Sequence, residues 1–397
     1  MRSMRLFFSG VAAGLALVAW TPGVRADVQS DQAAAIVVFP KLVVDTSNGV
    51  DTIVRLANRS NTPLTVNCFY VNATPRCVNG EGRCITDARF LDEPECTGTC
   101  EPQWQETDFR VVLTQNQPVA WLVSRGAVDC PSTPDGIDAD PGNNDPCFAL
   151  DGVFRVGPGG QSNAGSRIPP VPEDPFVGEL KCVVVDENDQ PLPRNDLYGH
   201  ASIVEGIQSG TDVLTDVSTY NAIGLRAMPQ NDGNRILVLG RDGDPGVEYS
   251  GCPNILILDH FFDLATDPVT GEQITTHVTF VPCSQDFLRQ EFRRTTVQFL
   301  VFNEFEQRFS TSRFVECFRN IQLSNIDTQV NNRSIFSAQV AGTLTGQTRI
   351  RGVADDHSDH GHTLLAVAEE FRPSSGAAAV NLHTQGVRPQ RDFLVLP

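Results

Sequence analysis

The chain has 397 residues with 30 Lys and Arg against 48 Asp and Glu, which gives a formal charge of −18 at neutral pH. Such an acidic chain is a poor match for nucleic acid, whose binding relies on clustered cations, and for electrostatic docking on an anionic membrane. Hydrophobic residues make up 40% of the chain, enough for a packed core, and this excludes wholesale disorder.

Residues 1–26 have the pattern of a secretory signal peptide. Two arginines precede an apolar run over residues 6–20, and small residues at positions 24 and 26 form a cleavage site before Asp27. The run is shorter than a membrane span, and no later segment has about 18 consecutive apolar residues. A retained N-terminal anchor is the alternative. We expect a secreted, periplasmic or cell-surface protein without a transmembrane segment.

Beyond the signal, short apolar runs rich in Val, Ile, Phe and Thr are separated by clusters of Gly, Pro, Asn and Asp. Many runs alternate apolar and polar residues, the period of a half-buried strand. In chain order the predicted strands are residues 35–39, 52–57, 64–71, 109–113, 119–123, 180–185, 235–239, 254–262, 275–281, 296–302, 314–318 and 339–350. Residues 286–294 predict a short helix with Ser284 as its N-cap, and residues 364–371 fit either a helix or a strand.

Short strands at this spacing predict an all-β protein whose antiparallel sheets close as a β-sandwich. We place two β-sandwich modules at residues 27–230 and 231–397, with the boundary in a turn-forming stretch. Two Cys- and Pro-rich insertions, residues 73–104 and 129–176, are expected as long loops on the first module. Long loops are common places for function.

Residues 54–66 combine a strand-like run, Asn58, a small polar turn, Pro63 and a second strand-like run. This segment resembles the hairpin of immunoglobulin-like modules in secreted and surface bacterial proteins, including fimbrial-chaperone-like and adhesin-type domains. The resemblance implies an immunoglobulin-like β-sandwich and carries no implication about activity. A chaperone's paired basic residues are not carried over, since Lys41 and Lys181 are the only lysines. A fainter echo between residues 52–69 and 297–318 favours two modules, although any two hairpins can look alike.

All 11 cysteines follow the signal peptide, and export makes disulfides their expected state. Loop closure favours pairing within one insert and around one loop, and two strand-like runs suggest a third link. The residues concerned are Cys77, Cys84, Cys96 and Cys100 in the insert, Cys130 and Cys147 around the loop, and Cys68 and Cys182 in the strands. An odd count leaves one thiol free or bound to another molecule. Zinc in the insert is the alternative, against which stands the lack of a CxxC motif.

An acidic stretch between Cys130 and Cys147 is a candidate calcium site. Calcium takes six to eight oxygen ligands from a flexible loop, and a disulfide-closed loop would hold like charges together unless a cation compensates them. The candidate ligands are Asp135, Asp138, Asp140, Asn143 and Asp145. The alternative is a solvated acidic loop without an ion.

Three of the seven histidines lie within six residues, at His357, His360 and His362. Neutral imidazoles beside carboxylates suit zinc or copper. The flanking residues are Gly and polar, so a solvated loop is the alternative and a catalytic zinc site a weaker one.

No P-loop, dinucleotide fingerprint or HExxH motif occurs in the chain. We therefore expect an exported structural, adhesive or binding protein of the cell envelope or extracellular space, stabilised by calcium, with an extracellular protein or glycan as partner. The alternative is a secreted carbohydrate-active or metal-dependent hydrolase on the same scaffold, because a sandwich fold alone does not decide between them.

Overall fold

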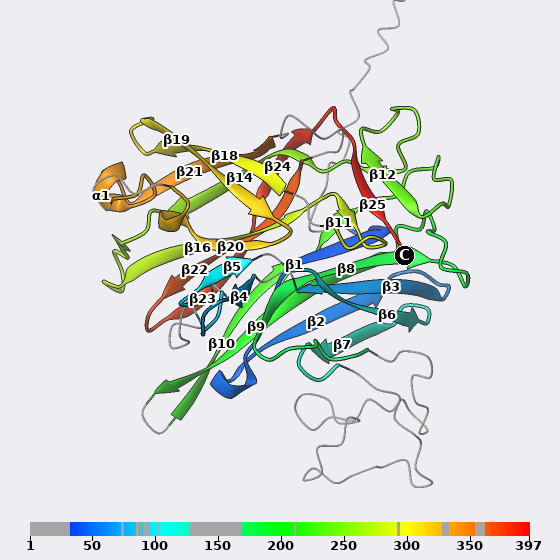
Figure 1. Cartoon of the computed structure of the whole chain (residues 1–397), viewed down its shortest axis with the longest axis horizontal. Coiled ribbons are helices and arrows are strands. Elements are labelled where there is room, and N and C mark those ends of the chain that lie inside the picture. The colour runs from blue at the N-terminus through cyan, green and yellow to red at the C-terminus, as the bar shows by residue number, and fades with distance from the viewer. Residues whose placement is uncertain are drawn as a thin grey trace, which may run out of the picture.

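The computed structural model describes residues 32–72, 75–84, 87, 89, 96–101, 103–126, 168–209, 212–291, 294–327, 333–353 and 362–397 (Figure 1). The expected signal peptide lies outside these residues. Strands dominate the described part, which otherwise holds the four-residue helix α1 (Ala338–Ala341) and 3-10 turns such as η1 (Thr46–Asn48) and η3 (Leu323–Asn325). The prediction of an all-β chain with antiparallel sheets is confirmed.

Residues 32–225, here called the N-terminal half, form two large antiparallel sheets. The first has the order β11 (Ile223–Leu225), β1 (Ile36–Val44), β8 (Phe176–Val185), β3 (Leu64–Asn72), β6 (Gln105–Leu113). The second has the order β10 (Asp212–Asn221), β9 (Leu197–Ser209), β2 (Val50–Asn58), β7 (Pro118–Leu122). Both sheets contribute side chains to one hydrophobic cluster.

Residues 236–397, here called the C-terminal half, form two more large sheets. One has the order β19 (Arg308–Glu316), β18 (Arg294–Asn303), β21 (Thr345–Val353), β14 (Pro253–Phe261), β24 (His383–Val387). The other has the order β15 (Ala265–Thr266), β16 (Gln273–Pro282), β22 (Leu364–Arg372), β23 (Gly376–Asn381), with β20 (Arg319–Gln322) also paired to β16. A second hydrophobic cluster draws on both of these sheets.

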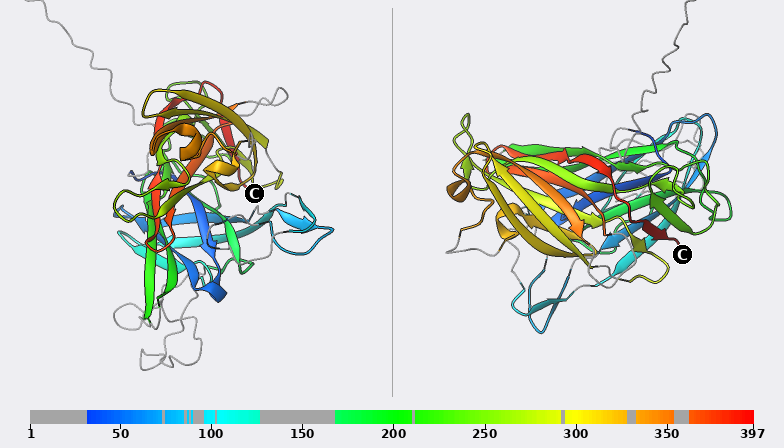
Figure 2. Two further views of the ribbon diagram at one scale, coloured as in Figure 1. Left: turned by 90° about the vertical axis from the view of Figure 1, so that its left-hand side faces the viewer. Right: turned by 90° about the horizontal axis from the view of Figure 1, so that it is seen from above.

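Two small sheets complete the fold. A mixed sheet has the order β13 (Tyr249–Ser250), β12 (Ile236–Gly240), β25 (Asp392–Val395), β17 (Gln285–Asp286). The paired strands β4 (Arg76–Val78) and β5 (Thr99–Glu101) lie in the first Cys-rich insertion and project from the side of the molecule, cyan in Figure 2.

The two halves pack against each other over strands β1 and β8. Every residue of these two strands is buried, whereas the more peripheral β18 alternates between buried and less buried positions. The first hydrophobic cluster continues into the C-terminal half through residues such as Leu237, Leu365 and Leu394. Polar side chains on the faces of β1 and β8 that meet the C-terminal half are therefore shielded from water.

Two local predictions differ from the structure, and one that was left open is decided by it. The described residues 286–291 form no helix: the end of β17 and a turn occupy them. Ser284 donates a hydrogen bond from its hydroxyl to Asp392 at 2.8 Å instead of capping a helix. The predicted strand 339–350 begins with helix α1, which ends at Gly342 in the left-handed region. The ambiguous residues 364–371 are strand β22.

Residues 54–66, where the sequence suggested a hairpin, form a connection between two sheets. Strand β2 pairs with β7 and β9, and β3 pairs with β6 and β8, so the two strands flank the turn without pairing. Asn58 holds the turn: its amide donates to the carbonyls of Thr62 and Thr114, and its Oδ1 accepts from the backbone of Ser60.

No helix among the described residues is long and apolar enough to cross a membrane.

Candidate functional site

A β-bulge in strand β1 places a lysine between the halves. The register between β1 and β8 shifts between Phe39 and Leu42, so Lys41 falls in the irregular stretch. Bulges disrupt the ladder and re-aim a side chain. The hydroxyl of Tyr220 replaces the lost pairing, because it accepts from the Lys41 backbone N–H at 3.1 Å and donates to the Lys41 carbonyl.

The ammonium of Lys41 is the centre of a buried group that we call the first ion cluster: Lys41, Asp87, Arg89 and Glu369. Lys41 Nζ lies 2.5 Å from Asp87 Oδ2 and also contacts Glu369 Oε2. Arg89 Nη2 lies 2.8 Å from Glu369 Oε1, and Arg89 Nη1 lies 3.3 Å from Asp87 Oδ1. All four side chains are at most 1% exposed.

The first ion cluster joins three separate parts of the chain. Lys41 comes from β1 in the N-terminal half, Glu369 from β22 in the C-terminal half, and Asp87 and Arg89 from the Cys-rich insertion. Arg89 also reaches Glu205 of β9, at 3.2 Å, and its guanidinium lies 4.9 Å from the centre of the Phe371 ring. Two cations balance two fully buried carboxylates, which is the compensation that burial of charge requires.

The charges in this cluster hold one another ionised. Burial opposes ionisation of both carboxyls, but Arg89 and Lys41 outweigh it, lowering the pKa of Glu369 to about 2 and that of Asp87 below its usual range. Burial likewise opposes the charge on Arg89, yet Glu369 and Asp87 raise its pKa. A network of this kind holds the strands and the insertion in place, and its groups do not exchange protons near neutral pH.

The other lysine forms a second ion cluster, made of Lys181, Glu179 and Gln285. Lys181 Nζ donates to Glu179 Oε2 at 2.9 Å, to the Pro282 carbonyl at 3.0 Å and to Gln285 Oε1. Gln285 Nε2 in turn donates to Glu179 Oε1. Lys181 and Glu179 come from β8 and Gln285 from β17, so this cluster also bridges the halves. All three residues are at most 1% exposed.

The second cluster has the opposite electrostatic character. Burial raises the pKa of Glu179 in spite of Lys181, and burial lowers the pKa of Lys181 in spite of Glu179. Both shifts favour the neutral acid and the neutral amine. The first cluster holds the guanidinium of Arg89 in addition to its lysine. Among the described residues, Lys181 is the one basic side chain in the second cluster.

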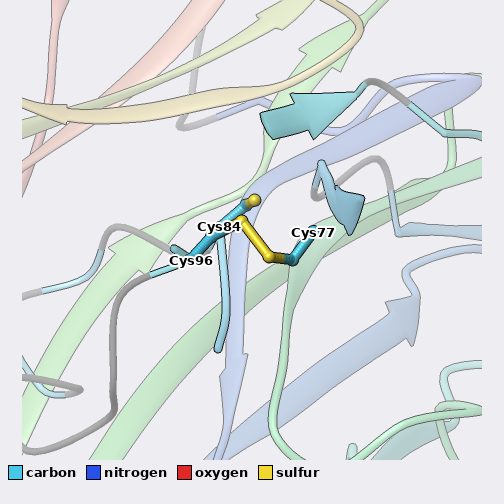
Figure 3. A group of neighbouring side chains, drawn as sticks. All are labelled: Cys77, Cys84 and Cys96. Carbon is cyan, nitrogen blue, oxygen red and sulfur yellow. A yellow bond between two sulfur atoms is a disulfide. The ribbon is translucent and has the colours of Figure 1, made fainter. Parts of the chain in front are cut away.

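The four cysteines of the insert form two disulfides, Cys77–Cys96 and Cys84–Cys100. Sulfur atoms of Cys77, Cys84 and Cys96 lie within 4.8 Å of one another, a spacing that resembles a metal-binding group. Figure 3 shows these three side chains together. The reason for their closeness is the packing of two disulfides, and a sulfur in a disulfide is no thiolate ligand. These bonds tie down the insertion that carries Asp87 and Arg89.

Two further disulfides lie in the body of the protein. Cys68 and Cys182 face each other across β3 and β8 and are bonded, the link suggested by their strand-like runs. Cys252 and Cys283 are also bonded, a pair that the sequence reasoning did not propose. Cys317 is a buried thiol.

Most of the predicted metal ligands lie outside the described residues. The acidic residues Asp135, Asp138, Asp140, Asn143 and Asp145 lie outside the described residues, as do Cys130, Cys147, His357 and His360. His362 is described: it precedes β22 and is buried, with its carbonyl packed against Gly352.

An open pocket in the C-terminal half is lined by several acids. Glu304, Asp259 and Glu370 line it, with buried His260 also in the wall. Hydrogen bonds from Thr345 lower the pKa of Glu304, whereas burial raises the pKa of Glu370. Sequence reasoning did not single out these residues, because among 48 acids only the folded geometry selects a pair.

No protein-family model, curated protein or solved structure matches the chain.

Proposed function

We propose that this protein is an exported structural or adhesive component of the cell envelope or extracellular space, built as two immunoglobulin-like β-sandwich modules. The observation that carries the proposal is the bracing of an exposed Cys-rich insertion. Two disulfides hold it, and Asp87 and Arg89 anchor it between the halves. A fixed projection on a rigid, oxidised body suits a contact surface better than a site that must move during turnover.

The sandwich description of each half rests on its core. In each half two large antiparallel sheets contribute to the same hydrophobic cluster, as the inner faces of a sandwich do. Disulfides and the lack of a membrane-spanning helix among the described residues are compatible with an extracellular protein.

The test uses untagged protein recovered from its own cells. Export predicts an N-terminus at Asp27. The proposed role predicts that the folded protein is retained on cell surfaces or on an immobilised glycan panel without turnover, and that Asp87→Asn with Arg89→Met, which frees the insertion, weakens this retention. Protein that keeps residues 1–26, or that converts a substrate and is not retained, would contradict the proposal.

Calcium stabilisation is part of the proposal and has its own test. Millimolar calcium should raise the melting temperature, and Asp138→Ala with Asp140→Ala should abolish the increase, because carboxylates would be the main ligands. A matched change of two acids elsewhere, Asp242→Ala with Asp244→Ala, should leave the increase intact. Identical melting in calcium and in EDTA would refute a calcium site.

The acid-lined pocket favours a second candidate function, a secreted glycoside hydrolase. Two carboxyls whose pKa values are pushed apart, as for Glu370 and Glu304, are the arrangement of a general acid and its partner. Hydrolysis of a polysaccharide that is lost in both Glu370→Gln and Glu304→Gln would support it. Turnover that survives both changes, or no turnover by the wild type, would rule it out.

A further inference from the structure

The second ion cluster brings together an amine, a carboxyl and a carboxamide in a closed triangle. Lys181 Nζ contacts both Glu179 Oε2 and Gln285 Oε1, and Gln285 Nε2 contacts Glu179 Oε1. The Pro282 carbonyl accepts a third hydrogen bond from Nζ and fixes its position. A nucleophile, an acyl group and a proton carrier are thus in contact within a site shielded from water.

We propose that Lys181 and Gln285 join through an isopeptide bond between Nζ and Cδ, formed by the folded protein itself with release of ammonia. The inference is independent of the proposed extracellular role.

The reaction needs no external reactant. A proton first passes from the Lys181 ammonium to Glu179, giving a neutral amine and a neutral acid. Nζ then attacks Cδ of Gln285, and Glu179 gives its proton to Nε2. The Cδ–Nε2 bond breaks, ammonia leaves, and the extra proton on Nζ returns to Glu179. One C–N bond forms and one breaks, and the net charge is unchanged.

The surroundings favour this sequence of steps. Burial favours neutral forms of both Lys181 and Glu179, which are the forms that attack and donate the proton. Holding the groups in contact replaces an encounter that would be very slow in solution. Exclusion of water also protects the new amide from hydrolysis.

The first ion cluster is a natural comparison within the same molecule. Lys41 contacts the carboxyls of Asp87 and Glu369, yet Arg89 is bonded to both and keeps them ionised. An ionised carboxylate is a poor acyl group and cannot donate a proton. We therefore assign the covalent step to Lys181 alone.

The test is the mass of the intact wild-type mature protein after reduction, alkylation and denaturation. The chain should be one ammonia lighter than its sequence. After digestion, fragmentation should identify a branched species that joins the peptides carrying Lys181 and Gln285. A chain of full sequence mass, recovered folded as judged by circular dichroism, would overturn the proposal, as would a loss of ammonia that fragmentation places on an asparagine.

A variant tests the role of the proton carrier, Glu179, separately from the roles of the two residues that would be joined. Glu179→Gln keeps the lysine and the amide but removes the acid, so its chains should have the full mass. The control Glu316→Gln changes a partly exposed carboxyl on β19, in a sheet that does not hold this cluster, and should retain the loss of ammonia. Equal cross-linking in Glu179→Gln and wild type would refute the assigned role of Glu179.

Discussion

Arg89 is the residue whose removal should harm this fold most through charge. Its guanidinium is shared by Glu369, Asp87 and Glu205 and is shielded from water. We expect Arg89→Met to lower the free energy of unfolding by about 3–5 kcal/mol, because two buried carboxylates would share one cation. Urea unfolding measures this change.

The control is Arg294→Met, which makes the same replacement of an arginine at the protein surface. Arg294 lies 3.6 Å from Glu316, and both side chains are more than a third exposed. This change should cost about 1 kcal/mol or less. Similar losses for the two variants would show that burial of the Arg89 network carries no special weight.

His260 makes stability depend on pH. It is buried beside Phe262 and Phe336, its Nδ1 faces the Phe261 carbonyl, and its Nε2 contacts Thr348 at 2.8 Å. Burial lowers its pKa to about 4, against an ordinary value of 6.5. Between these values the unfolded chain binds the proton more readily, so stability falls as the pH falls through this window, by up to about 3 kcal/mol at its lower end.

The change His260→Gln keeps a polar partner for Thr348 and removes the titration. We expect the variant to lose less stability than the wild type between pH 7 and pH 4.5 in urea unfolding. His383→Gln, at an exposed position, should behave like the wild type. Equal losses in all three proteins would mean that His260 does not contribute to the acid sensitivity.

The disulfides of the β4–β5 insertion are more exposed to solvent than those in the body of the protein. Cys77 and Cys96 are half-buried in the β4–β5 insertion, whereas Cys68, Cys182, Cys252 and Cys283 are at most 1% exposed. Because thiol–disulfide exchange requires access to sulfur, a mild reductant should open the insertion's bonds first. Alkylation after increasing reduction times, followed by peptide mass spectrometry, gives the order. Simultaneous opening of all four bonds would contradict it.

Alternating runs were sufficient to locate most of the strands that pack one face on a core. Residues 52–57, 64–71 and 296–302 fall inside β2, β3 and β18. Strands β9 and β10 were missed because polar and charged residues interrupt their apolar pattern. Helix α1 was not predicted, because it is only four residues long and it ends at Gly342 without a change in the hydrophobic period.

The internal echo has a physical basis in two asparagines. Asn303, at the end of β18, accepts from the backbones of Phe305 and Gln307 and donates to the Ala341 carbonyl, much as Asn58 does at the end of β2. The echo reflects a turn held by a buried amide. It does not extend to pairing, because β18 and β19 form a hairpin whereas β2 and β3 do not.

The ion clusters could not be predicted from the sequence. Lys41, Glu179, Lys181 and Glu369 lie in apolar runs, where local reasoning expects each charge to point to solvent. Only the packing of one half on the other buries them, and that packing depends on residues more than a hundred positions apart. Asp87 and Arg89 lie in an insertion whose sequence has no strand pattern.

At the scale of the whole molecule, the two halves are expected to unfold together. The first hydrophobic cluster crosses from one half to the other, and both ion clusters bridge them. Separating the halves would expose to water the apolar side chains that the first hydrophobic cluster shares between them, which is costly. Calorimetry should show one transition whose calorimetric and van't Hoff enthalpies agree. Two resolved transitions would mean that the halves are independent.

The burial of Lys41 and Lys181 has a practical consequence. They are the only lysines in the chain, and both are at most 1% exposed. An amine-directed ester applied to the folded protein therefore meets no accessible ε-amine and reacts at the α-amine alone. Molecules coupled in this way to a biosensor surface or a fluorophore would carry one tether or one dye each, at the start of the chain, and would share one attachment point.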